Sequence, residues 1–395
     1  MEVFNSFRWA FENANGIEDV EAKQALKDAV SDFWKAFEEH QEDILFSFSD
    51  DPKIDVVNFM GFYLQSIHPQ ISWEFGPGIN GKELRLVMTP EEHVSLRPFV
   101  DYIVSAAPEL EKWEFYNRRP KENMDNTRLL VEAKTGSVLE PMKFSASINE
   151  FNEIDLVFVG DEVKDQDDVD FILNQAFVVA ECMLGEELMD KWIGFIDSAS
   201  SVEVNIQLQE ITSLEEFVNG LISQVRDSQF DFQSIAKDSY KAYQLDPQDF
   251  ADYPAQGDLQ NAKTAYPQMW ENAHNGESFY SERYAKEGKF AYLKVEKTEG
   301  TGSFSSKEEL GESLNSALLS QQLGGVMGNG EGKKYYYHDL YLKDVPTGID
   351  TITTLLGDKG LTKRAWIHFY DSELAEEWVG VSSESPQPYL PSEVY

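Results

Sequence analysis

Residues 366–372 read WIHFYDS, and this stretch has an earlier counterpart in the same chain. Residues 192–198 read WIGFIDS, with the same residue at five of the seven positions. Both stretches have the pattern expected of a β-strand, and each follows a segment with a helical pattern. Two shorter matches precede them in the same order: Asp155-Leu156 with Asp339-Leu340, and Leu184-Gly185-Glu186 with Leu356-Gly357-Asp358. Three matches in one order favour an internal duplication.

The hydrophobic pattern around each stretch predicts a module of strands and helices. In the first module, strands are expected near 83–88, 113–116, 142–148, 153–160 and 192–197, with helices over about 91–104 and 169–190. In the second, strands are expected at 290–295, 335–342 and 365–370, helices at 306–320 and 347–357, and a glycine-rich turn at 324–334. We interpret both series as β-α-β-β-α-β, the split motif of ferredoxin-like folds. The expected fold class is therefore α+β, a tandem duplication of a ferredoxin-like (split β-α-β) module.

The chain is expected to begin with a helical hairpin. Its first helix covers 19–40, where apolar residues recur every three or four positions, and its second covers 56–67. The hairpin and the first module are expected to fill residues 1–200, a partly helical connector 201–286, and the second module 287–380. Residues 381–395 contain three prolines and are expected to form a flexible tail.

The composition limits the classes of partner. The 395 residues include 71 acidic and 33 basic side chains, for a net charge of −38. Aromatic residues make up 13% of the chain, which excludes a disordered acidic polymer. Such a negative surface repels phosphate, so duplex nucleic acid and anionic membranes are excluded as partners. A basic protein is the expected partner.

The number of cysteines and the length of the apolar segments indicate the cellular compartment in which the protein is expected. Cys182 is the single cysteine, which excludes an intramolecular disulfide and a zinc site built on cysteine. The first eight residues include charges, unlike a secretory signal, and no apolar run approaches the roughly 20 residues that span a bilayer. We therefore expect a cytoplasmic protein, with Cys182 as a core residue.

No motif for catalysis or for cofactor binding is found. Residues 324–334 fail as a phosphate-binding loop, because Met327 replaces its first glycine and Lys334 its hydroxyl residue. The acidic residues 161–170 lack the glycine and final glutamate of an EF-hand. His338 and His368 on neighbouring strands remain a hypothetical metal pair. We expect no catalytic residues, no cofactor and no metal.

The second module offers a candidate binding face. A ferredoxin-like sheet carries helices on one side, so its other side would expose a group of aromatic and histidine side chains. These are Tyr335, Tyr337, Tyr341, Trp366, His368 and Tyr370. Tyr and Trp dominate binding hot spots, which favours a partner- or ligand-binding role. The alternative is that the two modules, or two subunits, bury these faces against each other.

A basic group after the strand at 113–116 is a second candidate. Arg118 and Arg119 are predicted either to bind an anion or to pair with the abundant carboxylates of the chain. The second interpretation is favoured by the excess of acidic residues.

These features favour a non-enzymatic acidic binding protein that engages, and in one version neutralises, a basic protein. In charge and element order the chain is similar to small acidic ferredoxin-like regulators of bacterial RNA-degrading enzymes. One alternative is an enzyme or small-molecule binder with a pocket on the aromatic sheet face, using His338, His368 or the carboxylates Glu181 and Glu186. Another is a self-associating structural protein, a homo-oligomer joined through the aromatic faces.

Overall fold

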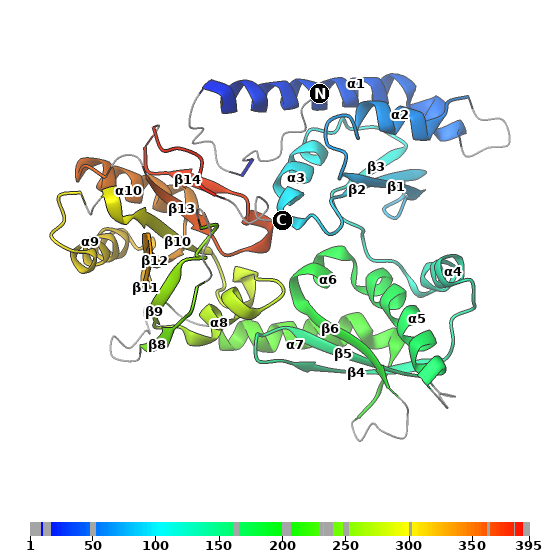
Figure 1. The fold of residues 1–395 in the computed structure, drawn as a ribbon. Helices are drawn as coiled ribbons and strands as arrows, with labels where there is room; N and C mark the ends of the chain where they lie inside the picture. Colours follow the sequence, from blue (N-terminus) through cyan, green and yellow to red (C-terminus); the bar gives the residue numbers. More distant parts are fainter. Residues whose placement is uncertain are drawn as a thin grey trace. The chain divides into compact units, whose positions relative to one another are not determined.

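The computed structural model describes residues 9–10, 17–47, 53–160, 166–199, 207–229, 232, 240–247, 253–299, 302–361, 364–382 and 384–389 (Figure 1). The chain forms two compact units. Unit 1 contains Met1–Asn117, Asp231–His274 and Glu287–Tyr395, and unit 2 contains Arg118–Phe230 and Asn275–Lys286. Both units are therefore discontinuous in sequence. The division differs from the expected one, because residues 201–286 are not a separate connector but are shared between the units.

The amino-terminal part of unit 1 is a helical layer on a small sheet. Helices α1 (Ile17–Phe46) and α2 (Val56–Tyr63) confirm the two helices expected there. Strands β1 (Ser72–Pro77), β2 (Leu84–Thr89) and β3 (Trp113–Tyr116) form a sheet in that order. The strands β2 and β3 are parallel, and the chain between them forms η1 (Val94–Leu96) and α3 (Arg97–Ser105). All three helices pack on this sheet in one hydrophobic core.

The rest of unit 1 is built on a seven-stranded antiparallel sheet. Its strands are β8 (Lys241–Gln244), β9 (Leu259–Thr264), β10 (Lys289–Glu296), β11 (Gly324–Gly332), β12 (Tyr335–Leu342), β13 (Ala365–Phe369) and β14 (Trp378–Gly380). Their order in the sheet is β14-β13-β10-β12-β11-β9-β8. Helix α9 (Lys307–Ser320) links β10 to β11, and α10 (Val345–Asp358) links β12 to β13. The central strands β13-β10-β12-β11 therefore follow the β-α-β-β-α-β order of a split β-α-β motif.

Helices α9 and α10 cover one face of this sheet. Both begin at side-chain caps, where Ser306 and Asp344 accept hydrogen bonds from backbone N–H groups three residues later. Leu310, Leu314 and Leu318 recur every fourth residue along α9 and are fully buried. They pack with the apolar side of α10 and with the strands in a single core. Short 3-10 turns η5 (Lys297–Glu299) and η6 (Ser372–Leu374) follow β10 and β13.

The prediction of a glycine-rich turn at 324–334 is wrong, because residues 324–332 form the strand β11. The strand pairs with both β12 and β9. Its glycines leave room for side chains of neighbouring elements, since a Cβ at Gly328 would lie 2.6 Å from Asp339 Oδ2. A Cβ at Gly325 would similarly lie 2.6 Å from Asn315 Oδ1. Glycine is therefore required by close packing here.

Unit 2 is a four-stranded sheet packed with helices. Its strands β4 (Met142–Ile148), β5 (Ile154–Gly160), β6 (Ile193–Ala199) and β7 (Gln209–Glu210) lie in the order β6-β5-β4-β7. Its helices are α4 (Met124–Thr135), α5 (Gln166–Leu184), α6 (Glu186–Trp192), α7 (Leu214–Ser228) and the 3-10 turns η2 (Ile211–Ser213) and η4 (Ser281–Arg283). The helix expected at 169–190 is thus two helices, which separate at Gly185, where φ is 76°. Cys182 is buried, as expected.

The first predicted ferredoxin-like module is wrong. Its first two strands, β2 and β3, belong with β1 to a three-stranded sheet of unit 1 in which β2 is the central strand, whereas β4, β5 and β6 belong to the sheet of unit 2. The matched sequences also sit in different pairings. Strands β5 and β6 are direct parallel neighbours, while β10 lies between β12 and β13 and is antiparallel to both. The sequence matches therefore do not reflect a shared sheet arrangement.

Two further segments differ from expectation. Residues 275–286 return to unit 2, where the buried Arg283 donates hydrogen bonds to Glu153 and to the carbonyl of Lys191, the latter at 2.6 Å. The described part of the expected tail is packed against the sheet. Trp366 Nε1 donates to the carbonyl of Pro386 at 2.6 Å, and Ser385 is buried.

Candidate functional site

The aromatic sheet face that we expected to be uncovered lies in the interior of unit 1. Tyr335, Tyr337, Tyr341, Trp366 and His368 are all buried, and Tyr370 is half-buried. Most of them belong to an aromatic core that includes Tyr253 and Trp270. The latter lies on α8 (Pro267–Asn275), within the segment expected to be a connector. The chain's own residues thus cover the face, and its aromatic side chains are packing material.

A buried polar network runs through this aromatic core. The hydroxyl of Tyr370 donates to Asp339 at 2.7 Å, and Gln256 lies between Tyr370 and His274. Burial raises the pKa of Asp339 to about 6 and lowers that of His274 to about 4. The His368 ring stacks on Tyr292 with centroids 5.1 Å apart. Tyr370, Asp339, Gln256 and His274 thus have hydrogen-bond partners inside the core, whereas His368 Nε2 has none among the described residues.

The hypothetical pair of histidines is not formed. His338 shares a face with Leu293 and Ile367, whereas His368 shares the opposite face with Asp339, as the strand register requires. Within the described residues, no three His, Cys, Asp or Glu side chains come together as a metal site would need. Asp161 to Asp165 lie outside the described residues.

Arg119 pairs with carboxylates, in line with the second interpretation of the basic group. Its Nη1 lies 3.2 Å from Glu181 Oε1, and its backbone N–H donates to Glu186 Oε2 at 2.7 Å. Lys134 also binds Glu181, at 2.9 Å. Arg118 is half-buried. The two glutamates proposed for acid–base chemistry are therefore engaged in structural contacts of unit 2.

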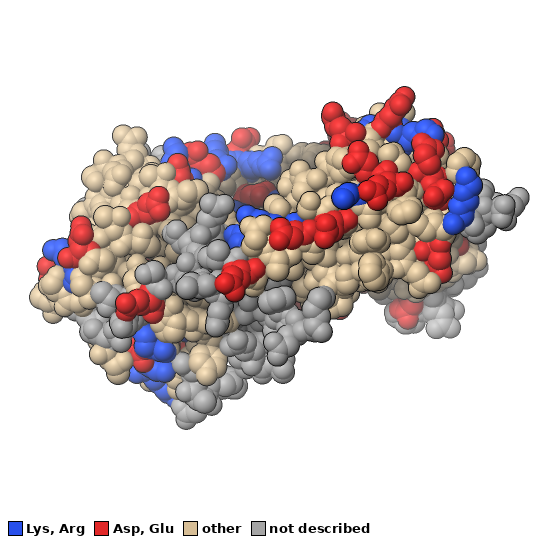
Figure 2. Space-filling model, turned by 90° about the horizontal axis from the view of Figure 1, so that it is seen from above, with Lys and Arg blue, Asp and Glu red and all other residues tan. Residues whose placement is uncertain are grey.

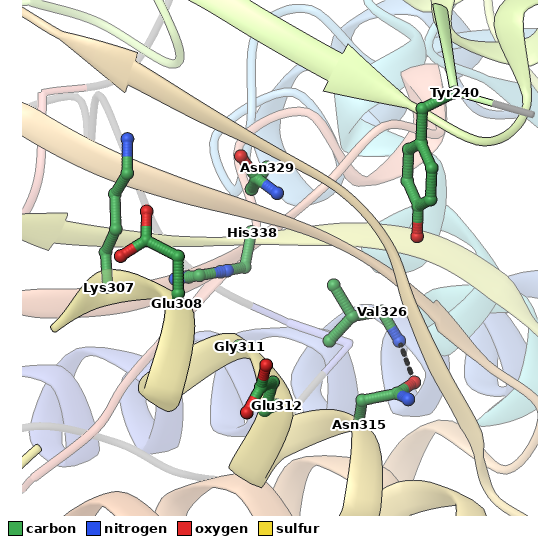
Figure 3. A pocket seen from close by; sticks show the side chains of 9 residues that line it. All are labelled: Tyr240, Lys307, Glu308, Gly311, Glu312, Asn315, Val326, Asn329 and His338. Atoms are coloured by element: carbon green, nitrogen blue, oxygen red, sulfur yellow. Dashed lines mark hydrogen bonds between the residues drawn. The ribbon is translucent and has the colours of Figure 1, made fainter. Parts of the chain in front are cut away.

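A cavity of about 230 Å³ lies on the helical side of the large sheet, between α9 and the strands β11 and β12 (Figure 3). Its wall combines charged, polar and apolar side chains. The lining residues are Tyr240, Lys307, Glu308, Gly311, Glu312, Asn315, Val326, Asn329 and His338. Four of them recur on α9 at positions 308, 311, 312 and 315, which places them on one side of the helix.

His338 is the buried polar group of this cavity. The residue is 2% exposed, and neither ring nitrogen has a hydrogen-bond partner among the described residues. Burial, aided by the Lys307 ammonium, lowers the pKa of His338 to about 4. The ring fits beneath α9 because Gly311 has no side chain: a Cβ there would lie 3.0 Å from His338 Nδ1. The imidazole is thus neutral at pH 7 and lines the cavity.

Some charged side chains around the cavity have an ion-pair partner and others do not. The Lys307 ammonium lies 2.7 Å from Glu331 Oε2, and Lys297 lies 2.8 Å from the other oxygen of the same carboxylate. Hydrogen bonds from its own backbone N–H and from Ser306 keep the pKa of Glu308 below its ordinary value. Glu312 is exposed and has no ion-pair partner among the described residues. The cavity therefore presents two carboxylates, while its lysine is already neutralised.

The hydrophobic pattern of the sequence does not predict this cavity. A signal was present in Gly311, a glycine inside an otherwise regular leucine-patterned helix. Such a glycine costs about 1 kcal/mol relative to alanine and indicates a close approach.

A second candidate surface is the exposed side of α1. Glu21, Asp28, Asp32 and Glu39 follow one another at intervals of seven, four and seven residues, so they lie within about 40° of arc over about 27 Å. All four are exposed, and the opposite side of the helix is buried in the core. We call these four residues the acidic row. Figure 2, seen from the side of α1, shows acidic side chains spread along this face with fewer basic ones.

Little in the acidic row is neutralised. Asp28 accepts a hydrogen bond from the amide of Gln24 at 2.9 Å. Glu21, Asp32 and Glu39 have no ion-pair partner within the part of the chain that is described. The exposed Lys35 lies on the same side of α1, between Asp32 and Glu39, so the row combines four carboxylates with one neighbouring positive charge and is negative in sum.

No protein-family model matches the chain, and no curated protein or solved structure is significantly similar to it. None of the helices that the structure describes is both long enough and apolar enough to cross a membrane.

Proposed function

We propose that this protein is a non-enzymatic binding protein that engages a basic protein through its acidic surface, with the acidic row on α1 as the docking edge. The observation that carries the proposal is the row itself, four exposed carboxylates along one line of a helix whose other side is fixed in the core. The net charge of −38 supports it, because a field of this sign accelerates encounter with a cationic partner.

The proposal extends to the cellular setting and the fold. The protein acts in the cytoplasm, as a regulator of an RNA enzyme or as a neutraliser of a nucleic-acid-cleaving toxin, since both classes of partner carry basic surfaces. The strands β10 to β13, with α9 and α10, are a ferredoxin-like domain that carries additional strands at both edges. This inference is supported by their strand order. Association through the aromatic faces is not proposed, because those side chains are buried.

The test compares two variants with the same change in net charge. The row variant carries E21Q, D28N, D32N and E39Q. The control carries E132Q, E140Q, E216Q and D227N, four exposed acidic residues of unit 2. Tagged proteins are used to capture partners from native lysate at low salt, and the captured basic protein is purified and titrated against each variant.

The proposal is supported if a stoichiometric basic partner binds the row variant about tenfold more weakly than it binds the control variant. This factor is expected because several surface charge pairs are lost, and each contributes up to about 1 kcal/mol. Equal weakening in both variants would show that only net charge matters, and it would contradict the acidic row as the docking edge. Recovery of no basic protein by the wild-type chain would contradict the proposal.

A further inference from the structure

We propose that the cavity beside α9 binds a small organic cation, a primary ammonium or guanidinium group that donates hydrogen bonds to His338 and lies against Glu308 and Glu312. This inference goes beyond the proposed function and does not depend on it, because the cavity and the acidic row are on separate elements of unit 1.

The first support is the unsatisfied imidazole. Buried polar side chains almost always have a hydrogen-bond partner, and leaving one unpaired is costly. His338 is 2% exposed, lines the cavity and has no partner among the described residues. A neutral imidazole offers one N–H donor and one acceptor nitrogen. A ligand with N–H groups would satisfy the acceptor nitrogen from within the cavity.

The amide of Asn329 adds a second polar group. Its side chain lines the cavity and makes no hydrogen bond within the described part of the chain. Asn315 is different, because its Oδ1 already accepts the N–H of Val326 at 3.0 Å and so fixes the strand β11 (Figure 3). An acceptor oxygen on Asn329 and an acceptor nitrogen on His338 both suit a ligand that is rich in N–H donors.

The charge pattern favours a cation over an anion. Among the described residues that line the cavity, Lys307 is the single lysine or arginine, and its ammonium is paired with Glu331 at 2.7 Å. Glu308 and Glu312 lie one helical turn apart on α9 and face the same opening. An anionic ligand would meet two carboxylates and an engaged lysine, whereas a cation meets complementary charge.

The remaining wall suits a short alkyl chain with a charged end. Tyr240 contributes an aromatic ring whose centroid lies 4.7 Å from Lys263 Nζ, so this ring is already engaged by a cation of the chain and offers a ligand apolar contact. Val326 contributes an apolar patch. The volume of about 230 Å³ is below the roughly 300–1,000 Å³ of pockets for drug-sized molecules, so the ligand is small. Either a free amine or a basic side chain of another protein has this chemistry.

The experiment titrates the full-length protein with defined probes at constant ionic strength. The free probes are 1,4-diaminobutane and guanidinium ion, and the side-chain probes are capped Gly-Lys-Gly and Gly-Arg-Gly peptides. Tetramethylammonium is the control, because it carries the charge without an N–H donor. Binding is followed by the NMR shift of the His338 ring and by calorimetry.

A saturable shift of the His338 ring, with a dissociation constant of about 1 mM or tighter for at least one donor probe, is the expected result. Saturation by free amines alone identifies a free molecule as the source of the cation, and saturation by the peptides alone identifies a protein side chain. No saturation with any probe would overturn the inference, and so would an equal effect of tetramethylammonium.

Two variants and one control variant make the test more specific. Glu312→Gln should weaken binding about two- to fivefold, as expected for one exposed charge interaction. Asp350→Asn, an exposed charge on α10 away from the cavity, is the matched control and should leave binding unchanged. His338→Phe should weaken binding at least about tenfold by removing the buried acceptor. If His338→Phe does not fold, the comparison of Glu312→Gln with Asp350→Asn decides, and equal effects of those two would overturn the inference.

Discussion

Replacing His338 by leucine should remove a defined part of the acid sensitivity of unit 1. The native ring has a pKa of about 4 because it is buried, whereas the unfolded chain has an ordinary histidine near 6.5. Protons therefore bind the unfolded state first as the pH falls. The free energy of unfolding should decrease between about pH 6.5 and pH 4, and it should be unaffected by this group above that range.

The magnitude follows from the two pKa values. Near pH 5 the unfolded state holds almost one more proton on this residue than the native state, which gives a slope of about 1 kcal/mol per pH unit. Between pH 7 and pH 4.5 the loss amounts to about 2 kcal/mol. Among the described residues of the surrounding wall, the charged groups are Lys307, Glu308 and Glu312, and they stay in place in the variant. The difference between wild type and variant therefore isolates His338.

The assay is urea unfolding at several pH values from 4.5 to 7, with hydrogen exchange of peptides from β12 to assign the transition to unit 1. At pH 7 the leucine variant should differ from the wild type by no more than about 1 kcal/mol, since an unpartnered polar ring is replaced by an apolar side chain. Val326→Ala, in the same cavity wall, should lower stability equally at every pH. An unchanged pH slope in His338→Leu would refute the reasoning.

Three stability predictions follow from other contacts. Arg283→Met should destabilise unit 2 by about 3–5 kcal/mol, because it leaves the carboxylate of Glu153 buried without its partner. The measurement is hydrogen exchange of residues 275–286, which should lose protection in the variant. Unchanged protection would contradict the assignment of these residues to unit 2. Gly311→Ala should destabilise the protein by about 1–3 kcal/mol, because the added Cβ would lie 3.0 Å from the His338 ring. Gly357→Ala adds its Cβ in open space and should stabilise the protein by about 0.5–1 kcal/mol in urea unfolding. The reverse order of the two variants would contradict the close approach of α9 to His338. Trp366→Ala should cost about 3–5 kcal/mol in the same assay, and a near-neutral result would mean that this face is not buried.

Local patterns in the sequence predict the individual helices and strands better than they predict which strands pair with one another. The helices α9 and α10 and the strands β10, β12 and β13 are short-range features, set by leucine spacing and by alternation. Strand β11 was missed because its many glycines carry no hydropathy signal, and its place depends on side chains that pack against it from other elements.

Pairing between strands distant in sequence explains the main error. The strands β2 and β3 lie where the sequence predicts them, yet they form a sheet with β1, which was not predicted, rather than with β4 and β5. Similarity of short stretches could not reveal this, because a strand sequence of this length fits either a parallel or an antiparallel neighbour. The aromatic face was misassigned for the same reason, since α8 reaches it from a segment that has an irregular polar sequence.

The central claim is most directly tested by the salt dependence of binding to the captured basic partner. Purified protein and partner are titrated at salt concentrations from roughly 0.05 M to 0.5 M, a range over which exposed charge interactions become screened. Docking through the acidic row predicts that the dissociation constant rises by at least about tenfold over this range, and that the row variant shows a smaller rise than the charge-matched control. A dissociation constant that does not change with salt, or the same dependence in both variants, would contradict the account.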